Sequence, residues 1–168
     1  MKRINHVIDG AAISYFLAYK CLMEKNLELC NYYRDKISSY IFPALTLAAF
    51  SCELALKARI KDECGKIKRG HDLEKLFREL TYNSCLDLMN RTRILYDLKA
   101  RIYKSSDSFI PLDFNRLLSL SKDTFTTCRY FYEGSMSVNL DFLEALMFCL
   151  NDVDDDYQAF ILKFKASL

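Results

Sequence analysis

Two ionisable residues stand one helical turn apart in the most apolar stretch of the sequence. Glu53 and Lys57 lie within residues 41–60, which are otherwise mostly apolar. Residues four apart share one face of a helix, so the two can form an ion pair on a solvated stripe, which stabilises a helix by only a few tenths of a kcal/mol. The alternative is a polar site on a central helix, where ionisable groups need partners. Spacing alone favours the solvated pair.

The second candidate for chemistry is His71, one of two histidines in the chain. It lies between Gly70 and Asp72, where a helix is expected to begin. One interpretation is a capping or turn role, and the other is a role in ligand binding or proton transfer. The sequence leaves both open.

The third candidate is the end of a later predicted helix, where Arg129, Tyr132 and Glu133 follow one another closely. A guanidinium, a phenol and a carboxylate can together contact the base and phosphate of a nucleotide. The same residues can equally pin one helix end to another, and Arg129 and Glu133, one turn apart, can simply pair.

Local charge adds a weaker indication. The stretches 57–69 and 91–104 are rich in Lys and Arg, although the net charge of the chain is only +2. If the two stretches were neighbours in space, they would form a face that attracts phosphate. Ordinary solvated helix surface explains them at least as well.

Several classes of site are not indicated. The sequence has no Gly-rich phosphate loop, no GxSxG or HExxH motif and no zinc-finger spacing. None of its seven cysteines is paired at CxxC spacing. We expect reduced, structural thiols in a reducing compartment, with no metal site and no cofactor.

The composition predicts an all-α fold. Gly 4 and Pro 2 are low counts for a chain with 51% hydrophobic residues, and sheets with their turns consume both residue types. We predict an antiparallel bundle of five to seven helices in a single domain, residues 1–168. Helical periodicity places them near 7–25 (continuing over 27–39 after a weak break at Asn26), 40–64, 72–80, 85–103, 113–133 and 140–164, the last interrupted by the acidic cluster 152–156.

The N-terminal residues and the apolar stretch 41–60 indicate where in the cell the protein is expected. The basic start is not followed by the apolar run of a secretory signal, because Asp9 interrupts it. Residues 41–60 contain Glu53, Lys57 and Arg59, which favours a buried core helix over a membrane span. We therefore expect a cytoplasmic protein that does not contact a membrane.

Three segments, in this order, resemble the HEPN superfamily of small helical nucleotide- and RNA-associated domains. Residues 48–57 look like the core helix of the family, with its Glu-x-x-x-Lys pair. Residues 70–73, Gly-His-Asp-Leu, look like the segment that many HEPN sequences carry after that helix. Residues 129–133 look like the Arg-Tyr-x-Tyr-Glu stretch of a late helix. Order and spacing agree over about residues 45–133.

The resemblance implies an antiparallel bundle of four or five helices that is often dimeric. Many members are metal-independent ribonucleases with an Rx4–6H motif, whose arginine and histidine come from two protomers. Others accompany a minimal nucleotidyltransferase in toxin–antitoxin pairs or bind nucleotides without cleaving them. This chain departs from the motif: no histidine follows Arg129, and His71 follows Arg59 and Arg69 at the wrong separations. No catalytic pair can be assigned, and whether the chain is an enzyme stays open.

We therefore predict a HEPN-like, non-catalytic or degenerate domain that binds nucleotide or RNA as a homodimer, within a toxin–antitoxin or defence system. The binding site would be lined by Glu53, Lys57, His71, Arg129, Tyr132 and Glu133. One alternative is a metal-independent ribonuclease with His71 or Tyr132 as proton donor. Another is a protein interaction module, with a nucleotidyltransferase or antitoxin as partner and residues 140–150 as the interface.

Overall fold

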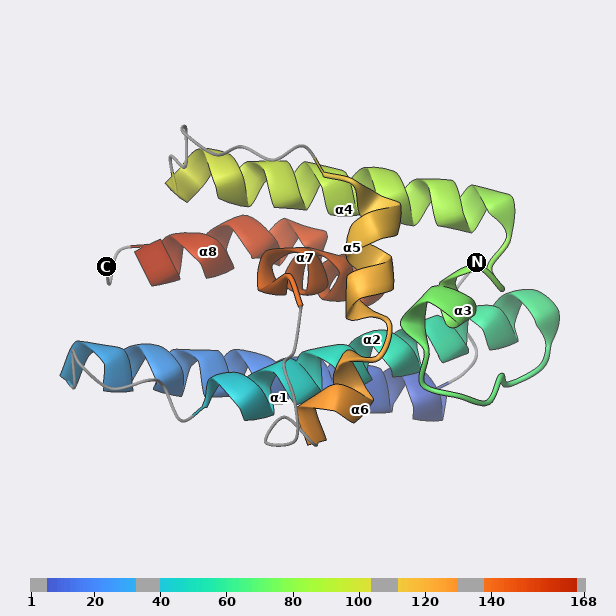
Figure 1. The fold of residues 1–168 in the computed structure, drawn as a ribbon, viewed down its shortest axis with the longest axis horizontal. Helices are drawn as coiled ribbons and strands as arrows, with labels where there is room; N and C mark the ends of the chain where they lie inside the picture. Colours follow the sequence, from blue (N-terminus) through green and yellow to red (C-terminus); the bar gives the residue numbers. More distant parts are fainter. Residues whose placement is uncertain (1–5, 33–39, 104–111, 130–137, 166–168) are drawn as a thin grey trace.

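The computed structural model describes residues 6–32, 40–103, 112–129 and 138–165, and within these ranges it is helical and contains no strand. The prediction of an all-α bundle is confirmed (Figure 1). In chain order the elements are α1 (His6–Tyr32), α2 (Ile41–Cys64), α3 (Leu73–Phe77), α4 (Tyr82–Tyr103), α5 (Phe114–Ser121), α6 (Thr124–Arg129), α7 (Leu140–Leu150), the 3-10 helix η2 (Asp154–Asp156) and α8 (Tyr157–Lys165).

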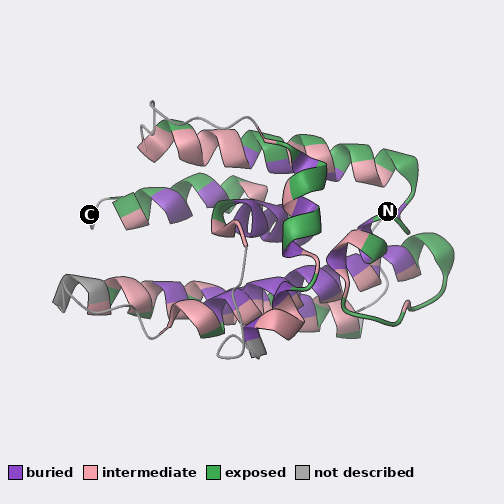
Figure 2. Ribbon diagram, viewed as in Figure 1, coloured by how far each residue is buried: buried purple, intermediate pink, exposed green. Residues whose placement is uncertain are grey.

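Helices α2 and α7 form the centre of the bundle. Figure 1 shows α1 and α2 as an antiparallel pair on one side and α4 on the opposite side, with α7 and α8 between them. Helix α2 packs against α1, α3, α6 and α7. Figure 2 shows that α7 is buried along most of its length, and every residue from Phe142 to Leu150 is buried. An apolar helix surrounded in this way contributes the core that holds the other elements in place.

The helices differ from the sequence-based boundaries in several places. Helix α3 ends at Phe77 instead of near residue 80, and α4 begins at Tyr82 instead of near residue 85. Helix α1 continues through Asn26 without the expected break. The helix predicted over 113–133 is divided into α5 and α6, and the last predicted helix is divided into α7, η2 and α8, as the expected interruption at 152–156 indicated. The second division occurs at Asp152, whose φ of 54° lies in the left-handed region that ends a helix.

Two caps fix the loop that carries His71. Helix α2 ends at Gly65, which has a φ of 71° and donates its N–H to the carbonyl of Lys61 at 2.7 Å. Helix α3 begins after Asp72, whose Oδ1 accepts from the backbone N–H of Lys75 at 2.9 Å. Asp72 is therefore the N-cap of α3, and the capping role that was one interpretation of His71 belongs to its neighbour.

Two arginines from the basic stretches 57–69 and 91–104 form hydrogen bonds and ion pairs with other helices of the bundle. Arg59 donates to the carbonyl oxygens of Cys149 and Leu150, at 3.1 and 3.3 Å, and pairs with Asp152 at 2.6 Å. Arg91 pairs with Asp152 at 3.1 Å and with both carboxylate oxygens of Asp154. These contacts hold the C-terminal end of α7, where cations are favoured by the helix dipole. They leave fewer cations for a phosphate-attracting face than the two basic stretches suggested.

A buried carboxylate joins four helices. Glu144 of α7 accepts hydrogen bonds from the hydroxyls of Tyr19 and Tyr157, the latter at 3.1 Å, and from Lys99 Nζ at 2.7 Å. Lys99 also contacts Asp141 at 2.8 Å. Burial and the adjacent carboxylate raise the pKa of both tyrosine hydroxyls. The cluster thereby ties α1, α4 and α8 to the centre of the bundle.

Helix α2 is also long and apolar enough to cross a membrane by length and composition. Of its most apolar window, 56% is buried inside the bundle. Its buried face includes Glu53, an ionisable residue that hydrocarbon would not tolerate without partners. These features are those of a helix that forms part of the core of the bundle.

The buried cysteine and tyrosine side chains of the core should make the free energy of unfolding depend on pH in the alkaline range. Burial raises the pKa of the Cys149 thiol to about 12 and raises the pKa of Cys52 and Tyr157 as well. A group with a raised folded-state pKa contributes stability that is complete below its unfolded pKa, about 8.5 for Cys and about 10 for Tyr, and is lost as pH rises above it. The free energy of unfolding in urea should therefore fall between about pH 8 and pH 11. Tyr157→Phe should reduce the slope above about pH 10, and a stability that stays constant over this range would contradict the buried network.

Candidate functional site

The buried carboxylate of Glu53 brings two distant sequence candidates together. Lys57 Nζ lies 2.6 Å from Glu53 Oε1. His71 Nδ1 lies 3.0 Å from Oε1 and 2.9 Å from Oε2 of the same carboxylate. Glu53 is only 1% exposed, so these two side chains replace the water that its charge would otherwise need.

The Glu53–Lys57 pair forms as its spacing indicates, but the surrounding stripe is not solvated. Lys57 is 14% exposed, and Glu53 and Ile60, which lie one turn before and after it on α2, are buried. An ion pair at such a position is weak evidence for stability, because removing both charges from water costs about as much as their attraction returns. The pair is better understood as a support for His71.

His71 is held by one ring nitrogen and is open at the other. Its Nδ1 donates to Glu53, and its side chain is 52% exposed. No described residue hydrogen-bonds to its Nε2. A neutral imidazole in this orientation presents a proton acceptor at Nε2, and a protonated one presents a donor to an anion.

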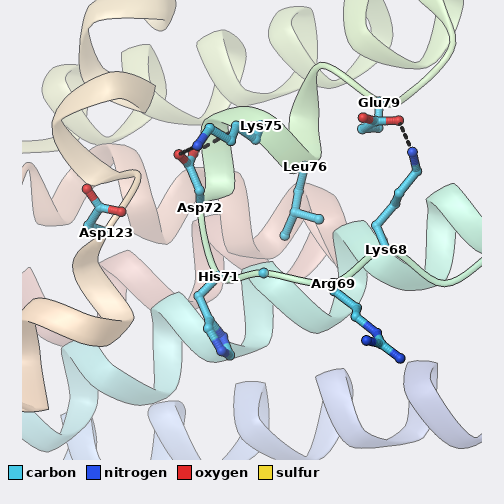
Figure 3. Close-up of a pocket in the computed structure, with 9 residues that line it drawn as sticks. Lys68, Arg69, His71, Asp72, Lys75, Leu76, Glu79 and Asp123 are labelled. Atoms are coloured by element: carbon cyan, nitrogen blue, oxygen red, sulfur yellow. Dashed lines mark hydrogen bonds and ion pairs between the residues drawn. The ribbon is translucent and has the colours of Figure 1, made fainter.

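A pocket of about 500 Å3 opens beside this imidazole (Figure 3). Its lining residues are Lys68, Arg69, Gly70, His71, Asp72, Lys75, Leu76, Glu79 and Asp123. Figure 3 shows Lys68, its partner Glu79 and Arg69 on one side of His71 and Asp123 on the other, so both charges occur in the lining of the pocket.

The cations of the pocket differ in their availability. Lys68 pairs with Glu79 at 2.7 Å, and Lys75 lies 3.5 Å from Asp72. Arg69 forms no ion pair with any residue that the structure describes. Arg69 is therefore the cation of the pocket that is best placed to meet an external anion.

An aromatic row continues from His71 across the surface. The ring of His71 lies 5.4 Å from that of Phe125 at an angle of 32°. Phe125 stacks on Phe50 at 4.7 Å and 18°, and Phe50 meets Tyr15 edge-on at 4.6 Å. This row was not predicted from the sequence, because aromatic residues at helical spacing look the same whether they fill a core or line a surface.

Three of the six predicted site residues come together, namely Glu53, Lys57 and His71. Arg129 ends α6, which packs against α2, but its side chain lies outside the described residues, as do Tyr132 and Glu133. Their membership of the site stays a prediction. Within the described ranges no group of His, Cys, Asp and Glu side chains is arranged to hold a metal ion. The cysteines at 21, 52, 64, 85, 128 and 149 are free thiols, and those at 21 and 64 are exposed.

Comparison with models of protein families, with curated proteins and with solved structures gives no match to this chain. The resemblance to the HEPN superfamily therefore stays a prediction, carried by the three sequence segments given above.

Proposed function

We propose that the chain is a nucleotide- or RNA-binding domain that holds a phosphate group at His71 and Arg69. One observation carries the proposal: the buried Glu53 fixes a half-exposed imidazole at the edge of a pocket, beside an arginine with no ion pair among the described residues. A histidine that only filled space would not need a buried carboxylate to orient it.

The chemistry of the pocket fits this ligand. Phosphate oxygens are bound best by charged N–H donors, and the planar fork of an arginine offers two at once. The volume of about 500 Å3 is in the range of small-molecule sites. Asp123 disfavours a second anion on the opposite side, and its carboxylate can accept hydrogen bonds from ribose hydroxyls instead.

We keep the HEPN-like assignment as part of the proposal, supported by the three segments and by an all-α fold. A homodimer, a nucleotidyltransferase or antitoxin partner, and a place in a toxin–antitoxin or defence system are supported by the resemblance alone.

Metal-independent RNA cleavage is a second candidate, favoured by the Glu53–His71 pair, because a carboxylate that orients an imidazole is a common arrangement for proton transfer. Incubation of single-stranded RNA with the protein and a metal chelator separates the two. Cleavage that disappears in His71→Ala supports an enzyme, and intact RNA with measurable binding supports a binding domain.

Binding of the phosphate group is tested with fluorescein-labelled single-stranded RNA and with adenosine 5′-monophosphate. His71→Ala and Arg69→Ala should each weaken binding about tenfold, since a hydrogen bond to a charged group contributes about 1.5–3 kcal/mol. Affinity should also fall as salt is raised. Fluorescence anisotropy and calorimetry measure both effects.

Matched controls are available for each variant. His6→Ala removes the other histidine of the sequence, and Arg101→Ala removes an exposed arginine on α4. Both should bind as the unmodified chain does. Asp123→Asn should strengthen binding two- to threefold by removing a negative charge from the pocket. Equal losses in the control and site variants would contradict the proposed location.

A further inference from the structure

The aromatic row formed by Tyr15, Phe50, Phe125 and His71 ends differently on its two sides. The ring planes of Phe50 and Phe125 differ by 18° and those of Phe125 and His71 by 32°, so the three planes are roughly aligned. At the far end Tyr15 meets Phe50 at 72°, edge to face, which ends the stack. At the near end His71 is half exposed, and no second described ring covers it.

The open end of the stack coincides with the polar pocket. His71 belongs to both, because its ring contacts Phe125 and also lines the cavity with Lys68 and Arg69. Its orientation is fixed from two directions, by the Glu53 carboxylate at Nδ1 and by the Phe125 ring against one face. The remaining face is a planar surface held in place before any ligand arrives.

Such a surface next to a cation suits one kind of ligand. Every nucleobase has a flat π-face, and stacking of an unpaired base on an aromatic ring strengthens binding about tenfold, with little dependence on base identity. A base inside a duplex has no free face to offer. The phosphate of a base placed on His71 lies within reach of the neighbouring Arg69, because both residues line the same pocket.

We propose that His71 is a stacking platform for one unpaired base, so that the ligand is single-stranded RNA or a free nucleotide and not a duplex. This inference rests on the proposed phosphate site and adds the recognition of the base to it. Phe125 and Glu53 act as positioning residues, since they hold the imidazole and do not touch the ligand.

The first experiment compares ligands on the unmodified chain. The probes are a short single-stranded RNA, a strand of the same length that is abasic at every position, the corresponding duplex, and ribose 5-phosphate beside adenosine 5′-monophosphate. We expect the base to improve affinity about tenfold in each matched pair, and the duplex to bind as weakly as the abasic strand.

The second experiment separates stacking from charge at the same residue. His71→Phe keeps a flat ring and loses the ring nitrogens, whereas His71→Leu keeps an apolar side chain and loses the ring. We expect His71→Phe to bind more weakly overall but to retain the preference for base over abasic ribose, and His71→Leu to lose that preference. Phe125→Leu should reduce the preference for base over abasic ribose. The control Phe164→Leu removes a ring that packs against Phe160 on α8 and should leave this preference unchanged.

The outcomes distinguish the two proposals. If no probe binds, both the phosphate site and the stacking platform are overturned. If abasic and ordinary strands bind equally, and His71→Phe behaves as His71→Leu does, the stacking platform is overturned and the phosphate site stands. A circular-dichroism melt of each variant identifies any that fails to fold, and the probe comparison on the unmodified chain then decides alone.

Discussion

Glu144→Ala is expected to lower the free energy of unfolding by about 3–5 kcal/mol, the largest effect of any single substitution proposed for this chain. The carboxylate is 1% exposed and accepts from Tyr19, Tyr157 and Lys99. Its removal leaves two buried hydroxyls and one nearly buried ammonium without their acceptor, although Lys99 retains Asp141. Urea denaturation followed by circular dichroism measures the loss.

Two further variants define what that loss means. Glu144→Gln keeps an acceptor for one tyrosine and should cost less than Glu144→Ala, because only the charge and part of the network are removed. Glu28→Ala removes a carboxylate of the same type from an exposed pair with Lys25 and should change stability by less than about 1 kcal/mol. If Glu144→Ala cost no more than Glu28→Ala, the four-helix cluster would not exist in solution.

Glu53→Met is expected to have the second-largest effect, a loss of about 3 kcal/mol, because it leaves the nearly buried ammonium of Lys57 without its counter-charge. The double variant Glu53→Met/Lys57→Met replaces the pair with two apolar side chains of similar length. Such replacements of buried ion pairs are often neutral or stabilising, so the double variant should recover most of the stability. Thermal and urea unfolding compare the two proteins with the unmodified chain.

The same pair of variants separates the fold from the site. In both, His71 loses the acceptor for its Nδ1, so both should bind single-stranded RNA about tenfold more weakly. Recovered stability without recovered binding is the expected result. A double variant that recovers both would show that Glu53 serves the fold alone.

Much of the fold was predictable because its signals are local. The scarcity of glycine and proline and the helical periodicity depend on residues close in sequence. The division between α5 and α6 was not predicted. The interruption of the last helix was expected at the acidic cluster 152–156, but its form depends on the left-handed backbone at Asp152, which pairs with Arg59 and Arg91 from other helices.

The candidate site was predictable only in part, for a similar reason. Glu53 was visible as an ionisable residue on an apolar helix, and His71 as a rare residue in a family-like segment. The two residues are eighteen positions apart, and their contact depends on the loop after α2 turning back to that helix, which spacing does not encode. Arg69 could not be singled out among the basic residues of the sequence, because its lack of an ion pair with the described residues, in contrast to Lys68 and Lys75, is visible only in the structure.

The central claim is that the Nε2 side of His71 meets the ligand while Glu53 holds the Nδ1 side. Nitrogen-15 NMR of the imidazole rings tests it directly, because the chain contains only two histidines and His6→Ala assigns the signals. On titration with single-stranded RNA, we expect the Nε2 signal of His71 to shift and saturate, with a smaller change at Nδ1 and none at His6. A titration in which RNA binds but both His71 nitrogens keep their positions would contradict the account.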